Sequence, residues 1–261
     1  MNPADVDALL ASHRSIRKYR SDPIPADVLD AVLHAATRAS TSGNMQTYSI
    51  IVTRDEARRR ELWKLHWEQD MILEAPVLLT FVADWNRMNR WCELSGTEPG
   101  FGNFLSFLVA FSDAFIAAQN AVLAAEAHGL GICYMGTTLG RPRELTEFFR
   151  LPPDTFPATT IVVGWPDEDP APRARLPIGG IVHDEFYIRP DDAGIRAIYA
   201  DRETEGWRRY QSFPDLAARM RESGVRNLAE VYTTLKYTKE DNEEQSARLL
   251  QQLRTAGFLR P

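Results

Sequence analysis

The segment FLSFLVAFSDAFIAAQNAVLAAEAH, residues 104–128, is apolar on nearly every face of the helix it would form. Such a pattern indicates a helix that is buried in a core or at an interface, because a surface helix keeps a polar face. Gly129 follows directly and is well placed to end the helix. The polar side chains of Ser106, Asp113 and Asn120 interrupt the segment, so we do not expect it to span a membrane.

Strands and helices alternate on both sides of this segment. The strand-like runs are YSIIVT (48–53), PVLLTFVAD (76–84), GICYMG (131–136) and ATTIVVGWP (158–166). Helical patterns begin near Pro3, after an Asn2 cap, and near Pro25, and further helices are predicted over 55–70 and 141–151. The alternation predicts a mixed α and β fold.

The last part of the chain differs in character. From about Asp191 it is polar, charged and mostly helical, which favours a solvated or partner-wrapping extension over a second core. We therefore predict a single domain over 1–261, with a core at about 1–187 and an extension at about 188–261.

Composition excludes several classes of protein. The formal net charge of −6 disfavours a nucleic-acid or anionic-membrane partner, because both usually require a broad basic surface. Cys92 and Cys133 lie far apart in sequence, so neither a disulfide framework nor a zinc site is expected. The first residues contain acids where a signal peptide needs basic residues, and we expect a cytoplasmic protein.

The familiar catalytic motifs do not occur in the sequence. It contains no GxGxxG, GxxxxGK[ST], HExxH or GxSxG pattern. Its five histidines are scattered without metal-ligand spacing, so no metal site is predicted, and a helical His34 or His66 is expected on the surface or in the core. A classical hydrolase, metalloenzyme or Rossmann dehydrogenase has no support.

Positive charge gathers in HRSIRKY, residues 13–19, although the whole protein is acidic. The arginine guanidinium matches phosphate oxygens two at a time, and histidine and serine add further donors. The stretch could therefore hold a phosphate. Alternatively, Arg14, Arg17 and Lys18 could complete the C-terminal turn of the first helix, complement its dipole and face water.

Four blocks in order resemble the nitroreductase family. They are HRSIRKYRSDPIP (13–25), ASTSGNMQ (39–46) followed by YSIIVT, AQNAVLAAEAHGLGICYMG (118–136), and IVVGWPDEDPAPRARLP (161–177). The likeness is greatest to the oxygen-insensitive NADPH nitroreductases and flavin reductases that carry a C-terminal extension. It implies an α+β, nitroreductase-like fold with a central mixed, mainly antiparallel sheet flanked by helices.

The resemblance also implies non-covalent FMN, held between the two chains of a homodimer, with the flavin rather than a side chain carrying the chemistry. The side chains expected at the phosphate and ribityl chain are His13, Arg14, Ser15, Arg17, Arg173 and Arg175. Those expected along the ring are Thr41, Gln46, Gln69, Tyr134, Met135, Gly136 and Thr137.

The implied reaction is a ping-pong transfer of hydride from NADPH or NADH to FMN and then to a nitroaromatic, quinone or flavin. The sequence departs from the subgroup at Gly136–Leu139, where Gly-Gly-Leu-Arg is usual and only Arg141 could replace the arginine. Two alternatives stay open. One is a specialised flavoenzyme, such as a biosynthetic oxidase or reductive dehalogenase, and the other is a flavin-binding sensor or carrier without turnover.

Overall fold

The computed structural model describes residues 2–259. They form two compact units, one comprising the chain up to Ala171 together with the residues from Gln245 onward, and the other Pro172–Glu244. Each unit is described by itself.

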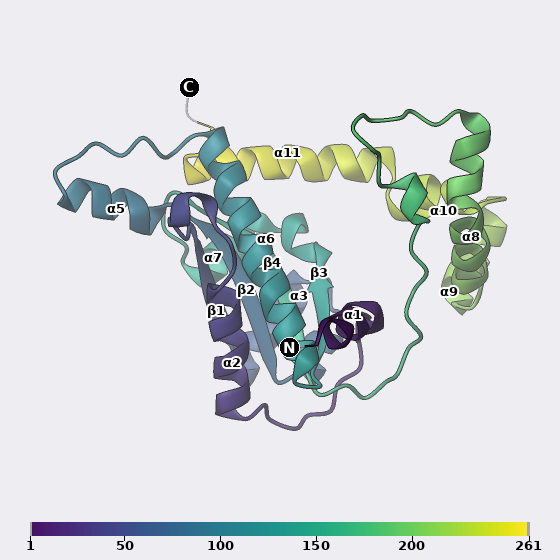
Figure 1. Ribbon diagram of the computed structural model, residues 1–261, viewed down its shortest axis with the longest axis horizontal. Helices are drawn as coiled ribbons and strands as arrows, with labels where there is room; N and C mark the ends of the chain where they lie inside the picture. The colour runs from purple at the N-terminus through teal and green to yellow at the C-terminus, as the bar shows by residue number, and fades with distance from the viewer. Residues whose placement is uncertain (1, 260–261) are drawn as a thin grey trace. The chain divides into compact units, whose positions relative to one another are not determined.

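The first unit is built on a four-stranded sheet (Figure 1). Its strands are β1 (Tyr48–Thr53), β2 (Val77–Asp84), β3 (Gly131–Met135) and β4 (Thr155–Gly164). They lie in the order β1-β2-β4-β3, and each neighbouring pair is antiparallel. The four predicted strands and the mainly antiparallel sheet are thereby confirmed.

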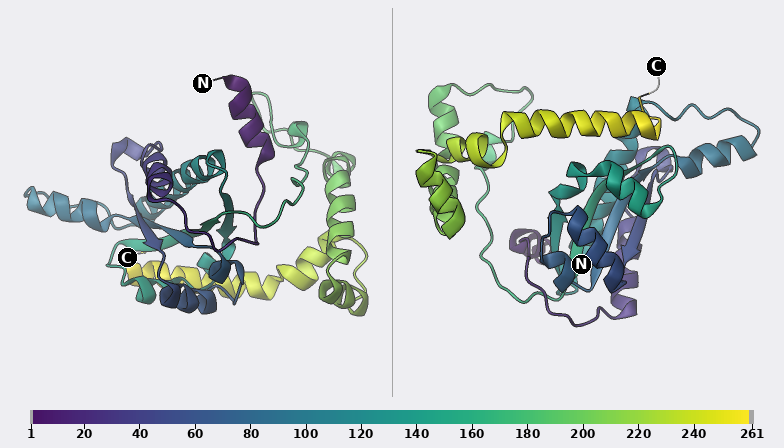
Figure 2. Two further views of the ribbon diagram at one scale, coloured as in Figure 1. Left: turned by 90° about the horizontal axis from the view of Figure 1, so that it is seen from below. Right: turned by 180° about the vertical axis from the view of Figure 1, so that it is seen from behind.

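Helices cover both faces of this sheet (Figure 2, left). One face packs against α2 (Ala26–Thr37) and α6 (Phe104–Ala127), and the other against α3 (Glu56–Leu65), α4 (Met71–Glu74) and α7 (Pro142–Phe149). Successive strand residues point to opposite faces, so β2 sends Leu79 to the α6 side and Leu78 to the α3 side. The α+β fold is thus three layers deep.

Helix α6 is the central helix of the first unit. Its alanines, among them Ala114, Ala117 and Ala121, are buried against the sheet, where their small side chains let the helix approach closely. By length and hydropathy α6 could cross a membrane, but its place against the sheet accounts for that apolar character. The predicted central helix is confirmed with nearly the same ends.

The basic turn, residues 13–20, lies beyond the first helix. Helix α1 (Pro3–Ser12), capped by Asn2 as predicted, has no basic residue in its last turn, so the proposal that these cations complete that turn is wrong. Instead the chain runs beside β3, where the Ile16 N–H donates to the Ile132 carbonyl at 2.9 Å. A Cβ on Gly131 would lie 2.7 Å from Ile16, so this close approach requires glycine.

The end of the chain contributes to the core of the first unit. Helix α11 (Lys239–Ala256) looks polar and exposed in sequence, yet Leu253, Ala256 and Phe258 are buried in one cluster with Trp85 and Phe156. The expectation of a wholly solvated or partner-wrapping extension therefore does not hold for these residues. The many polar residues of α11 made this apolar stripe hard to recognise in the sequence.

The second unit is helical. It contains α8 (Asp192–Gln211), α9 (Pro214–Glu222), α10 (Leu228–Val231) and a π-helical turn, Tyr232–Lys236. Its buried side chains are few: Ala217, Met220, Leu228 and Val231. The predicted helical character of this stretch is confirmed.

The remaining short elements of the chain are α5 (Asn86–Leu94) and the 3-10 turns Ser42–Asn44, Gly136–Gly140 and Ile178–Gly180.

Candidate functional site

Acidic side chains from distant parts of the sequence hold the basic turn. Glu168, in the loop after β4, accepts hydrogen bonds from the backbone N–H groups of Arg17 and Lys18, the latter at 3.2 Å. Glu74 accepts one from the Tyr19 N–H at 3.1 Å. The neighbouring Asp169 pairs with the Arg14 guanidinium. These carboxylates fix the backbone of the turn and pair the Arg14 guanidinium.

Helix α6 supplies a further carboxylate to the turn. Glu126 Oε1 lies 2.7 Å from His13 Nδ1. Burial raises the pKa of Glu126, and the charges of His13 and Arg14 oppose that rise. The first residue of the turn is thus tied to the end of the central helix.

Strand β3 brings its predicted residues beside the turn through the Ser15–Ile132 bridge. Burial, with a further contribution from Glu126, raises the pKa of Tyr134, whose hydroxyl donates to Gln119 at 3.2 Å. The Met135 residue is only 2% exposed, and it packs in the core on the α3 side. Its predicted place along the ring stays a prediction.

Gln69 and Thr137, which are far apart in sequence, meet in the structure. Helix α3 ends at Leu65, so Gln69 lies in the turn that follows, where its Nε2 donates to the His66 carbonyl at 3.2 Å and reaches Thr137 Oγ1 at 3.5 Å. Thr137 Oγ1 also lies 2.8 Å from His66 Nδ1. Its hydroxyl is thus held from two directions.

His66 is a buried histidine, as one of the two expectations for it stated. Burial lowers its pKa to about 4, so the ring is neutral near pH 7. Its Nε2 has no hydrogen-bond partner within the described residues. We infer a supporting role, because the neutral ring orients Thr137 without adding charge to the site.

The His66 pKa predicts how stability depends on pH. Between about pH 6.5 and pH 4 the unfolded chain binds a proton at this ring and the folded chain does not, so the free energy of unfolding should fall by roughly 3 kcal/mol as the pH drops through that range. Urea unfolding at pH 4.5, 5.5 and 7 would measure it. His66→Gln should flatten the dependence, whereas His34→Gln, on α2, should not. An equal slope in His66→Gln would contradict the assignment.

Asp113 holds the loop that contains Thr41 and Gln46. This carboxylate, 1% exposed on α6, accepts hydrogen bonds from the Ser42 N–H at 3.1 Å and the Thr47 hydroxyl at 2.9 Å. Gln46 has a φ of 53°, a left-handed conformation that costs a non-glycine residue about 1–2 kcal/mol. Sequence reasoning missed Asp113, although an acid in the middle of an apolar helix was the available signal.

The loop is attached near the middle of α6, and the basic turn is attached at its C-terminal end. Glu126 follows Asp113 by thirteen residues, which is about 20 Å along a helix. Within one chain the structure thus gathers the turn, Tyr134 and the Gln69–Thr137 pair around β3, and it holds Thr41 and Gln46 elsewhere.

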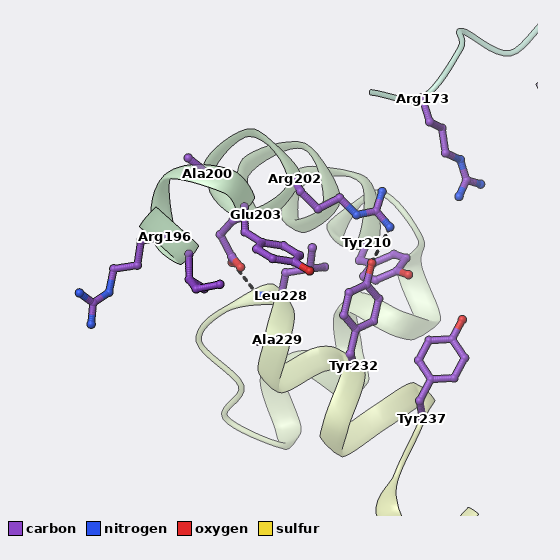
Figure 3. Close-up of a pocket in the computed structure, with 12 residues that line it drawn as sticks. Arg173, Arg196, Ala200, Arg202, Glu203, Tyr210, Leu228, Ala229, Tyr232 and Tyr237 are labelled. Atoms are coloured by element: carbon purple, nitrogen blue, oxygen red, sulfur yellow. Dashed lines mark hydrogen bonds between the residues drawn. The ribbon is translucent and has the colours of Figure 1, made fainter. Parts of the chain in front are cut away.

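Arg173 and Arg175 belong to the second unit. Arg173 lines a pocket of about 990 Å³ there, together with Arg202, Tyr210 and Tyr232 (Figure 3). The Arg202 guanidinium donates to the Tyr232 hydroxyl at 2.7 Å. Arg175 is exposed, and its Nη1 makes a long contact of 3.5 Å with the Arg173 carbonyl. Their predicted part in the phosphate site stays a prediction.

The aromatic residues near α5 divide into two groups. Trp85 is buried and stacks on Phe101 with ring centroids 4.3 Å apart, so these two are core. Trp91 and Phe104 are exposed. Arg141, the possible substitute for the missing family arginine, lies at the start of α7 and makes a long contact of 3.4 Å with the Lys64 carbonyl.

The residues around β3 suit a phosphorylated flavin. The turn offers cations and hydroxyl groups for a phosphate, and the Gln69–Thr137 pair offers polar groups for a ring. Gly136, between Met135 and Thr137, is exposed, and no atom lies within 4 Å of where its Cβ would be. A flat ligand can therefore approach the backbone there, which a larger side chain would hinder.

Comparison with known proteins identifies the family of this chain. The sequence matches the nitroreductase family over residues 10–165. It is 37% identical over 185 residues to an FMN reductase [NAD(P)H] of Bacillus subtilis, covering 70% of this chain and 74% of the relative. It is 32% identical over 197 residues to an oxygen-insensitive NADPH nitroreductase of Salmonella typhimurium, covering 76% and 80%.

Solved structures extend the likeness along the whole chain. The NfrA2 structure of B. megaterium superposes with a TM-score of 0.84 at 29% identity and covers 100% of both chains. YcnD of Bacillus subtilis, described as a hypothetical oxidoreductase, gives 0.85 at 30% identity and covers 99% of both. With its three-layer fold and the matching blocks from the basic turn to β4, this chain belongs to the nitroreductase family.

Proposed function

We propose that the protein is an FMN-dependent NAD(P)H oxidoreductase that reduces nitroaromatic, quinone or flavin-type acceptors by a ping-pong mechanism. The observation that carries the proposal is the basic turn, paired with β3 at Ile132, while the exposed Gly136 follows the other end of the same strand. Family membership supports an enzyme that uses FMN and a nicotinamide reductant. The physiological acceptor is a small aromatic molecule in this proposal.

The chain's own residues would bind and orient the flavin. His13, Arg14, Ser15 and Arg17 neutralise the phosphate and bond the ribityl chain, joined by Arg173 and Arg175. The backbone of Tyr134–Thr137 and the side chain of Gln69 line the ring, with Thr41 and Gln46 at its edge. When bound, FMN supplies the hydride and electron chemistry, so no side-chain nucleophile or acid is needed.

Anaerobic reduction tests the proposal. The purified protein should be yellow and should release FMN on denaturation. It should lose the visible absorbance of its oxidised flavin when NADPH or NADH is added without oxygen. Reoxidation by a panel of nitroaromatics, quinones and free flavin would then identify the acceptor class. Bound FMN that neither nucleotide reduces would contradict a reductase and favour the flavin carrier. Absence of bound flavin would contradict both.

The proposal includes a homodimer with each FMN site built from both chains. Helix α6 supports it, because the apolar side chains of Phe104, Leu105, Leu108 and Ile116 remain exposed, whereas its alanines are buried against the sheet. The separation of Thr41 and Gln46 from the basic turn along α6 also supports it. A second chain could supply the loop that the first chain holds too far away. We place the dimer in the cytoplasm.

Charge on the exposed face of α6 should disrupt the dimer. Leu105 is 70% exposed, so Leu105→Glu should leave the isolated fold intact but place a charge in an apolar interface. We expect the main species in sedimentation velocity to shift from dimer to monomer and to lose FMN. Lys64→Glu places a negative charge at an exposed position of α3, and this variant should remain dimeric. A dimeric Leu105→Glu protein would place the interface elsewhere.

A further inference from the structure

Glu126 is a buried carboxylate to which the proposed function gives no role. Its side chain is 11% exposed, and its Oε2 has no hydrogen-bond partner among the described residues. Burying a carboxylate that is only partly hydrogen-bonded costs free energy. We therefore expect Glu126 to have a function that offsets this cost.

Glu126 contacts the basic turn through His13. Its Oε1 lies 2.7 Å from His13 Nδ1. This side chain thereby holds the first residue of the turn. It does so from the last turn of a 24-residue helix that is packed against the sheet, so its position is rigid.

The contact with Glu126 occupies His13 Nδ1, so Nε2 is the ring nitrogen that remains for another partner. With Glu126 accepting at Nδ1, the proton there is fixed, as in carboxylate–histidine pairs at metal sites. A protonated ring carries a second N–H at Nε2, which can donate to an anion. The guanidinium of the next residue, Arg14, lies beside Asp169.

We propose that Glu126 is a positioning residue for the flavin phosphate, and that it acts through His13. The inference rests on the proposed function, since it assumes that the turn binds FMN. It adds that selectivity for FMN over riboflavin, which lacks the phosphate, depends on a carboxylate that does not itself contact the ligand. A purely structural Glu126 would support both flavins equally.

The test compares two flavins on one protein. The full chain, freed of flavin, is titrated with FMN and with riboflavin, and the dissociation constants are read from quenching of flavin fluorescence. Glu126→Gln keeps the side-chain volume but removes the charge that strengthens the His13 hydrogen bond. We expect its dissociation constant for FMN to rise about tenfold, while that for riboflavin changes less than about twofold.

Matched variants assign the effect. Glu56→Gln removes a carboxylate that also pairs at 2.7 Å, with Arg60, on exposed α3, and it should leave both constants unchanged. His13→Ala should reproduce the loss of FMN affinity, and adding Glu126→Gln to it should cause little further loss. His13→Ala changes no residue of α6, so it still tests the role of the Glu126–His13 pair if Glu126→Gln does not fold.

Several results would overturn the inference. They are unchanged FMN affinity in Glu126→Gln or His13→Ala, equal losses for FMN and riboflavin, or additive losses in the double variant. A wild-type protein that binds neither flavin would instead refute the proposed function. The two failures are thus distinguishable in one set of titrations.

Discussion

Replacing Asp113 with alanine should release FMN and lower the free energy of unfolding by about 3 kcal/mol. Asp113 is buried on α6 and accepts hydrogen bonds from the Ser42 N–H and from the Thr47 backbone and hydroxyl. Alanine would leave these donors buried without a partner. The loop would then lose the contacts that hold Gln46 in its left-handed conformation.

Two measurements check this prediction, urea unfolding and the flavin content of the purified protein. Asp113→Asn keeps one acceptor oxygen and should lose less in both. The neighbouring Ser112→Ala removes only an exposed hydroxyl bonded to the Leu108 carbonyl, and it should behave like the wild type. Full stability and full flavin content in Asp113→Ala would show that the loop is held by other contacts, such as those of Arg87 to the Gln46 and Tyr48 carbonyls.

Replacing Arg17 with alanine should weaken FMN binding by about ten- to a hundredfold, the range expected for a charge-assisted contact to phosphate. Within residues 2–259 the Arg17 guanidinium makes one hydrogen bond, a long one of 3.4 Å to the Ser15 carbonyl. The Arg14 guanidinium is by contrast already paired with Asp169. Arg17 is thus the arginine of the turn best able to serve an external anion.

The same titration with riboflavin should show almost no change in Arg17→Ala, because riboflavin has no phosphate. Arg20→Ala is the matched control, since Arg20 pairs with Asp22 at 3.5 Å and lies over the Trp165 ring. Both residues are exposed, so stability should change by less than about 0.5 kcal/mol. FMN binding that survives in Arg17→Ala would move the phosphate away from this turn.

Local patterns predicted most of the fold. The strands and α6 were recognisable because alternation and all-round apolarity depend only on neighbouring residues. The end of α11 was misread for the same reason, since the burial of Leu253 and Phe258 depends on a distant cluster. The sequence left open whether the basic residues complete the last turn of α1, because nothing local shows that the chain leaves the helix at His13 to pair with β3.

Sequence alone therefore determined the α and β elements, the basic turn as a candidate anion site, and the family. Only the tertiary structure decided which groups hold the predicted site residues: Glu126 on His13, Glu168 on the backbone of the turn, Asp113 on the loop that contains Thr41 and Gln46, and His66 on Thr137. Each of these contacts joins residues more than 60 positions apart. Chain folding alone brings such pairs together, so no spacing or composition in the sequence could reveal them.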